Sequence, residues 1–176
     1  FFVYFYLNRK RLTLASKGWL VFSSLFFYSW WSILYLPIIL SSMLFNYVVG
    51  GSLSRKNVKS RKLLLIFAIL VNISLLGYFK YTDFLIENFN MVSGSDIQLI
   101  NLTLPLAISF FTFQQIAYLV DSSKQEVREC DFLNYAVFVT FFPQLIAGPI
   151  VHHKEMMSQF SNIRTKVINY RNIIKG

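Results

Sequence analysis

The 176-residue sequence contains few of the side chains that usually carry chemistry. It has one cysteine and two histidines, and eight acidic residues stand against 17 basic ones. Cys130 has no second cysteine to pair with, and neither it nor the adjacent His152 and His153 has the spacing of a metal site. A glycine-rich phosphate loop and the Gly-x-Ser-x-Gly segment of serine hydrolases are also missing. These absences argue against a soluble enzyme, and we expect no bound metal or cofactor.

Apolar residues are what the sequence has in abundance. Hydrophobic residues make up 55% of it and aromatic residues 18%, yet the formal net charge is +9. A soluble domain this apolar would have too little polar surface to face water. The composition therefore predicts an all-α membrane protein with several transmembrane helices. Because the sequence opens on Phe1 without an initiator methionine, we expect it to be a fragment of a single membrane domain, with further chain after Gly176.

The basic residues gather in two short loops, near 9–17 and 55–62. By the positive-inside rule, both loops should lie in the cytoplasm. Since they flank apolar stretches, anionic membrane lipid is their expected partner, and nucleic acid is not. The expected membrane elements are a partial span at 1–7, spans at 19–35, 36–50, 63–80 and 104–120, a broken or re-entrant segment at 132–151, and an interfacial helix at 154–170.

Two of these boundaries depend on length and turn residues. The apolar run 19–49 would be about 46 Å long as one helix, which is too long for one ordinary span and short for two. We therefore expect a tight hairpin of two short helices that breaks near Pro37. Residues 82–103 are acidic and rich in turn residues, and they predict an outer connection with a short surface helix.

Polar residues interrupt the last two apolar stretches. Gln114, Gln115, Asp121 and Gln144 would be costly in lipid, so we expect them to face protein or a water-filled cavity. Pro143, Gly148 and Pro149 break the helix at 132–151, and broken backbone at membrane depth is tolerated only inside protein or beside a cavity. A purely structural alternative stays open for each polar residue, because an interhelical hydrogen bond contributes about 0.6–2 kcal/mol.

Segments 104–121 and 141–150, with the sequences LPLAISFFTFQQIAYLVD and FFPQLIAGPI, resemble the signature segments of membrane-bound O-acyltransferases. The resemblance is strongest to the bacterial alginate and peptidoglycan O-acetyltransferase branch. Three shorter matches, at 45–47, 76–81 and 156–160, occur in the same order as in that branch. The resemblance therefore extends over nearly the whole chain, although each segment alone would be a weak signal.

The resemblance implies a multi-pass helical protein of the bacterial inner membrane with a tunnel through it. An acyl thioester such as acetyl-CoA would enter as co-substrate from the cytoplasm, and a polysaccharide outside would receive the acetyl group. The family also implies a periplasmic acetyltransferase partner. Its catalytic histidine lies in a later hydrophobic helix, which would fall beyond Gly176, so the role does not pass to His152 or His153.

Within the resemblance, the residues expected to line the tunnel are Ser109, Thr112, Gln114 and Gln144. A second function class also fits the sequence, namely a non-enzymatic polytopic protein such as a polysaccharide transport or export subunit. A buried histidine farther along the chain would favour the enzyme, and an inverted repeat of the spans would favour the transporter. No internal repeat is visible in the sequence, which favours the enzyme.

Overall fold

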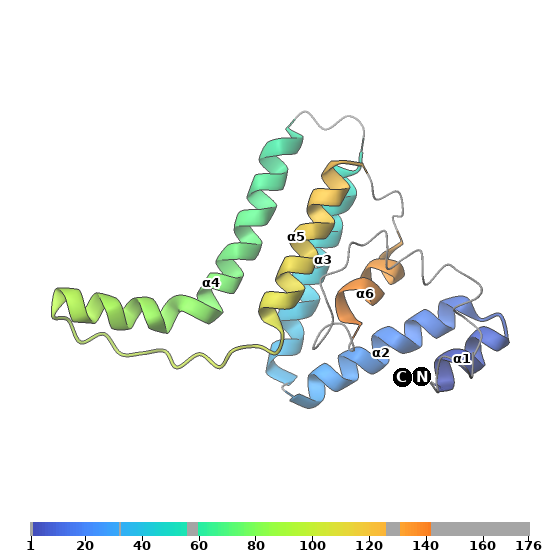
Figure 1. Ribbon diagram of the computed structural model, residues 1–176, viewed down its shortest axis with the longest axis horizontal. Coiled ribbons are helices and arrows are strands. Elements are labelled where there is room, and N and C mark those ends of the chain that lie inside the picture. The colour runs from blue at the N-terminus through green and yellow to red at the C-terminus, as the bar shows by residue number, and fades with distance from the viewer. Residues whose placement is uncertain (1, 32, 56–59, 126–130, 142–176) are drawn as a thin grey trace, which may run out of the picture.

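A computed structural model describes residues 2–31, 33–55, 60–125 and 131–141. Within these residues the chain is helical and contains no strand, in agreement with the all-α prediction (Figure 1). The elements are α1 (Phe2–Arg9), α2 (Thr13–Trp31), the short 3-10 helix η1 (Ile33–Tyr35), α3 (Leu36–Leu53), α4 (Arg61–Ser93), α5 (Ile108–Ser123) and α6 (Phe132–Thr140).

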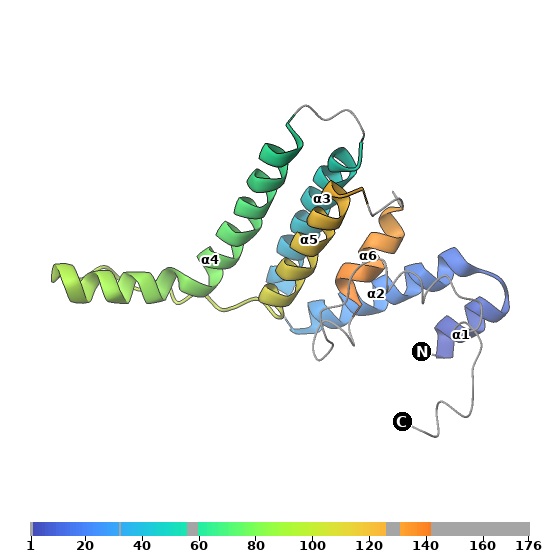
Figure 2. The ribbon, with the colours of Figure 1, turned by 45° about the horizontal axis from the view of Figure 1, so that its top comes forward.

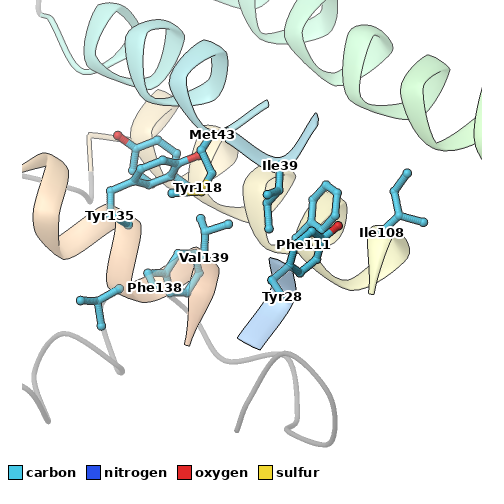
Figure 3. Close-up of a cluster of buried hydrophobic side chains, with 11 residues drawn as sticks. Tyr28, Ile39, Met43, Ile108, Phe111, Tyr118, Tyr135, Phe138 and Val139 are labelled. Carbon is cyan, nitrogen blue, oxygen red and sulfur yellow. The ribbon is translucent and has the colours of Figure 1, made fainter. Parts of the chain in front are cut away.

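Three helices stand side by side at the centre of the structure. α3 packs against α5 and α4, and α5 also packs against α4 (Figures 1 and 2). α2 meets the N-terminal end of α3 at an angle, and it packs against α6 and α1. The main core lies where α2, α3, α5 and α6 meet (Figure 3). The labelled side chains of this core are Tyr28, Ile39, Met43, Ile108, Phe111, Tyr118, Tyr135, Phe138 and Val139.

Local sequence signals explain several helix ends. Pro37 lies in the first turn of α3, where its missing N–H removes no helical hydrogen bond. Gly94 ends α4 in the left-handed conformation at φ 66°, which glycine adopts without strain. Asp131 caps α6, and its side chain accepts a hydrogen bond from the backbone N–H of Leu133 at 3.0 Å.

The expected span at 63–80 lies within a much longer helix. α4 continues to Ser93 and takes in the first part of the connection expected at 82–103. The reason is that residues 84–92 keep apolar side chains at helical spacing, while no glycine or proline interrupts them before Gly94. α4 changes direction along its length, so that its second half lies across the line of its first half (Figures 1 and 2).

Two other expected spans start at different residues. α2 begins at Thr13 rather than 19. Lys17, which was expected in the first basic loop, lies inside this helix. Its ammonium donates a hydrogen bond to Asn134 Oδ1 on α6. The element expected at 104–120 is helical only from Ile108 to Ser123. Pro105 and the left-handed Ala107, at φ 55°, keep the residues before Ile108 out of the helix.

The expected hairpin of 19–35 and 36–50 differs from the observed geometry. α2 and α3 meet at η1, but they diverge instead of packing along each other (Figure 1). α2 packs mainly against α6 and α1, whereas α3 packs mainly against α5 and α4. The partial span at 1–7 lies in α1, and the first part of 132–151 forms α6. The rest of that element and the helix expected at 154–170 lie outside the described residues.

Two of the described helices are long and apolar enough to cross a membrane. They cover Ile33–Leu53 and Arg61–Ser93. The core helix of a soluble protein would bury its apolar side chains, but those of α4 are largely exposed: Leu63, Ile66, Phe67, Leu70 and Ile73. An exposed apolar face of this extent fits a lipid environment.

Candidate functional site: buried polar residues between three helices

A cluster of buried polar side chains lies where α3, α4 and α5 meet. Ser42 and Asn46 come from α3, Asn72 from α4 and Gln115 from α5. All four are buried, and Asn46 and Gln115 have no exposed surface. We call these four residues the amide cluster.

The members of the amide cluster bond to one another across the helix interfaces. Asn46 Nδ2 donates to Asn72 Oδ1 at 3.0 Å, and Asn72 Nδ2 donates back to Asn46 Oδ1 at 2.7 Å. Gln115 Oε1 accepts from Asn46 Nδ2 and from Ser42 Oγ, each at 2.6 Å. Each asparagine also donates to the backbone carbonyl four residues before it, on Ser42 and on Ala68. The cluster therefore links three helices.

The spacing of these residues explains their meeting. Ser42 and Asn46 are four residues apart, so they share one face of α3. Asn72 interrupts the otherwise apolar first half of α4, and it turns toward α3 because lipid offers it no partner. Each interhelical hydrogen bond of this kind contributes about 0.6–2 kcal/mol in a membrane protein. The amide cluster is thus sufficient to fix the register of the three helices.

On a second face of α5, the side-chain oxygen of Gln114 has no such hydrogen bonds to the described residues. Gln114 shares the face of Phe111, three residues before it, and of Tyr118, four residues after it. Both aromatic residues belong to the core in Figure 3, where Tyr118 lies 4.4 Å from Tyr135 of α6 between ring centres. Gln114 is buried, and within the described part of the chain its Oε1 has no hydrogen-bond partner. The same holds for Oγ1 of the buried Thr112.

The other residues singled out from the sequence divide into two groups. Gln115 and Asp121 are buried in protein, as expected, and Ser109 at the start of α5 is half-buried. Gln144, Pro143, Gly148 and Pro149 lie outside the described residues. Ser109, Thr112 and Gln114 all lie on α5, but Thr112 and Gln114 are two positions apart and leave the helix about 200° apart, so they do not share a face. The role of these residues as tunnel lining stays a prediction.

α3 and α5 approach each other closely at Gly50. A Cβ atom added there would lie 2.8 Å from Cζ and 2.9 Å from the hydroxyl oxygen of Tyr118. The absent side chain at Gly50 therefore leaves room for the Tyr118 ring, which also contacts Tyr135. Below this contact, a pocket of about 390 Å³ is lined by Tyr47, Val48, Gly51, Ser52, Ser54, Arg55 and Tyr118.

A larger groove runs between α3 and α4. Its volume is about 760 Å³, and its lining is mostly apolar, with Ser42 and Asn72 of the amide cluster among the residues that face it. The full lining is Ser41, Ser42, Phe45, Phe67, Leu70, Val71, Asn72, Ser74 and Leu75. Within the described residues, no group of three histidine, cysteine or acidic side chains is placed to hold a metal ion.

Arg61, at the start of α4, forms hydrogen bonds at the ends of the other two central helices. From the first turn of α4, its guanidinium donates to the backbone carbonyl of Arg55, after α3, at 2.7 Å and to that of Ser123, at the end of α5, at 3.5 Å. A cation near helix C-termini is favourable because the terminal carbonyls carry partial negative charge. This end of the bundle also carries Arg55 and Lys62.

Sequence reasoning missed three members of the amide cluster. Ser42 and Asn72 were given no role, and Asn46 appeared only inside the family-like segment 45–47. The signal was nevertheless present, since an asparagine in the middle of an apolar span needs a partner. The identity of that partner depends on packing between helices that are far apart in sequence.

An apolar helical scaffold, with exposed apolar faces outside and amides that bond between helices inside, is typical of a helical membrane protein. Comparison with known proteins narrows this class. The chain is 47% identical to "Peptidoglycan O-acetyltransferase" of Helicobacter pylori over 189 aligned positions, which cover 93% of this chain and 36% of that protein. It is 33% identical to "Probable alginate O-acetylase AlgI" of Pseudomonas aeruginosa, over 85% of this chain and 30% of that protein. The corresponding protein of Pseudomonas putida is 31% identical, over 81% of this chain and 31% of that protein.

The chain is therefore a homologue of the bacterial alginate and peptidoglycan O-acetyltransferases, the branch of the membrane-bound O-acyltransferases that its signature segments resemble. This confirms the resemblance seen in the sequence. The chain spans about a third of the length of the relatives it matches. No family model matches it. No solved structure matches it either.

Proposed function

We propose that this chain forms part of a membrane-bound O-acetyltransferase of the bacterial inner membrane, a multi-pass enzyme. The enzyme moves an acetyl group from a cytoplasmic thioester donor, acetyl-CoA or a similar compound, to a polysaccharide outside the cell membrane. The observation that carries the proposal is the 47% identity to a peptidoglycan O-acetyltransferase over 93% of the chain. Since the identity to the alginate O-acetylases is lower, at 33% or less, we propose peptidoglycan as the acceptor.

The residues of this chain have a binding role in the proposal. Gln114, Thr112 and Ser109 line the path of the acyl donor, and Gln144 is proposed to join them. The buried Gln114 Oε1 and Thr112 Oγ1 have no partner among the described residues, and such atoms cost about 1–3 kcal/mol when left unsatisfied. A bound group with N–H or O–H donors, such as the amide-bearing arm of an acyl thioester, would satisfy the Gln114 oxygen.

Proton transfer is proposed to fall to a histidine in a later helix of the whole protein. It would remove the proton from the acceptor hydroxyl so that the oxygen can attack the thioester carbonyl. The proposal further includes a periplasmic acetyltransferase partner that completes delivery to the glycan. Both steps derive from the family resemblance. The names of the relatives favour this enzyme over a transport or export subunit.

The experiment is a substitution in the full-length protein, read out as O-acetyl content of the peptidoglycan. Gln114→Leu should lower the acetyl content by up to about tenfold, because the lost hydrogen bond is worth about 0.5–1.5 kcal/mol. Gln144→Leu should act in the same direction. Phe113→Leu is the matched control, since Phe113 is the neighbour of Gln114 on α5 but is 51% exposed.

Protein level in the membrane is measured alongside, so that loss of folding is separated from loss of activity. If both glutamine variants gave the wild-type O-acetyl content at normal protein level, the tunnel-lining proposal would be contradicted. Absence of any acetylation that depends on the wild-type full-length protein would sink the proposed activity as a whole.

A further inference from the structure

α4 is too long for the membrane that it crosses. Its 33 residues make a helix of about 50 Å, whereas the hydrocarbon core of a bilayer is about 30 Å thick. The apolar stretch 63–79 lies between Lys62 and Lys80 and accounts for about 26 Å. Residues 81–93 therefore extend about 20 Å beyond the stretch that fits the bilayer.

This excess does not continue in the same direction. The second half of α4 lies across the first, and the extended chain that follows Gly94 runs back beside it to α5 (Figures 1 and 2). We call residues 81–106, comprising this part of α4 and the returning segment, the arm. Most of the arm projects away from α3 and α5 (Figures 1 and 2), whereas its last residue, Leu106, packs against the main core.

Side chains of α4 fasten the returning segment to the helix. Asp83 accepts hydrogen bonds from the backbone N–H groups of Ile100 at 2.9 Å and Leu102 at 3.1 Å. Asn90 bonds to both the N–H and the carbonyl of Ile97. Four backbone groups of the returning segment, the N–H groups of Ile97, Ile100 and Leu102 and the carbonyl of Ile97, are therefore satisfied within the arm, which favours an environment poor in water.

The opposite side of the helix is apolar and exposed. Tyr81, Leu85 and Val92 fall on one face of α4, about half a turn from Asp83 and Asn90. Leu85 is 62% exposed and Val92 is 89% exposed, and Phe84 and Phe89 flank them with more than half of their surface open. Asn88 is the polar residue on this face, and its Nδ2 donates to the backbone carbonyl of Phe84. A face with this much exposed apolar surface is unfavourable in water.

Residues at the start of the arm are those that favour the membrane interface. Tyr78 and Tyr81 are half-exposed aromatic residues with polar tips, and the Lys80 ammonium lies 5.5 Å from the centre of the Tyr81 ring. Beyond Lys80 the arm carries only acidic charges, on Asp83, Glu87 and Asp96. Its charge thus contrasts with the second basic loop, at the other end of α4, which the positive-inside rule places in the cytoplasm.

We propose that the arm lies in the boundary between headgroups and acyl chains of the leaflet opposite the basic loops, with Leu85 and Val92 buried in lipid and Glu87 directed to water. The occupant of the apolar face is lipid because the face continues directly from a helix that crosses the bilayer. Since the arm has no basic residue beyond Lys80, apolar area rather than anionic lipid holds it in place.

The test uses the full-length protein in vesicles, with Cys130 and every other cysteine of the full-length chain replaced by serine as background. A single cysteine at Leu85, Val92 or Glu87 then carries an environment-sensitive fluorophore. With lipids brominated near the headgroup end of the acyl chain, the probes at Leu85 and Val92 should lose most of their emission, and aqueous iodide should quench them little. The probe at Glu87, the matched exposed position on the same helix, should show the reverse. Replacing phosphatidylcholine with phosphatidylglycerol should leave this pattern unchanged.

Each other outcome overturns the proposal. Strong iodide quenching at Leu85 and Val92 would place the arm in water, and weak quenching by both agents would mean that protein covers the face. If a labelled variant fails to fold, Phe89→Trp supplies a native-sized reporter on the same flank. Acetylation activity does not enter this readout, so failure here leaves the proposed function untouched.

Discussion

Two adjacent glutamines on α5 show how differently the same side chain can be used. Gln114 and Gln115 are both buried, and their side chains leave the helix about 100° apart. Gln115 Oε1 accepts hydrogen bonds from Ser42 and Asn46 of α3. Gln114 Oε1 accepts none from the described residues. Gln115 Nε2 also has no partner among the described residues, so the two glutamines differ at the carbonyl oxygen. Burial alone therefore does not distinguish a structural amide from one that is available to a ligand, whereas the hydrogen bonds of the oxygen do.

The difference follows from what each face of α5 packs against. The Gln115 face meets polar residues of α3 and α4, so its amide helps to hold these helices together. The Gln114 face is shared with Phe111 and Tyr118, whose neighbours in Figure 3 are aromatic and aliphatic. Substitutions on the first face should thus change stability first, and substitutions on the second should change activity first.

The largest effect should come from forcing α5 away from α3. Gly50→Ala places a Cβ against the Tyr118 ring, which is buried and packed on Tyr135, so it has little room to move. We expect a loss of about 2–3 kcal/mol in the free energy of unfolding. Thermal unfolding of the purified full-length protein in detergent would measure it. Gly51→Ala is the matched control, because a Cβ there meets no atom within 4 Å.

A smaller loss should follow from opening the asparagine pair. Asn72→Leu removes both bonds to Asn46 and leaves Asn46 Oδ1 buried without them. The expected cost is about 1–2 kcal/mol. Ser74→Leu on the exposed side of the same helix should cost little. A double-mutant cycle with Asn46→Leu should show coupling, and additive effects of the two substitutions would contradict a direct bond.

The hydrophobic pattern of the sequence was enough to predict the helices, because lipid-facing and core-facing residues leave long apolar stretches. It also predicted that Gln115 and Asp121 would be buried, since exposure to lipid is too costly. The pattern could not place the start of α2, because Lys17 has the charge of a loop residue and is accepted in a helix only through its contact with Asn134.

The sequence could not predict which side chains of different helices would bond to each other, for a different reason. Asn46 and Asn72 are 26 positions apart, and their meeting depends on the relative rotation of α3 and α4. In the same way, the rotation of α5 relative to α3 decides which of Gln114 and Gln115 meets a polar neighbour. Helical periodicity states that the two glutamines point in different directions, but only packing determines which direction is satisfied.

The glutamines themselves provide the direct test of the comparison. Gln115→Leu should lower the free energy of unfolding by about 1 kcal/mol, because Ser42 Oγ and Asn46 Nδ2 lose their shared acceptor. Gln114→Leu should leave stability unchanged or slightly raised, because it removes an unsatisfied buried oxygen. Melting temperatures of the two variants, measured side by side with acetylation, would reveal the contrast. Equal destabilisation by both would show that hydrogen-bond satisfaction does not separate their roles.

The smallest effect should come from Ser42→Ala. This change removes one of the two bonds to Gln115 Oε1, but Asn46 Nδ2 still donates to the same oxygen at 2.6 Å, so no buried acceptor is left alone. The expected loss is about 0.5 kcal/mol. Ser41→Ala is the control, because the exposed Ser41 bonds only to the backbone of its own helix.

In the Gln115→Leu background the effect of Ser42→Ala should disappear, since the acceptor is already gone. A persistent loss there would mean that Ser42 acts through its packing in the α3–α4 groove rather than through Gln115.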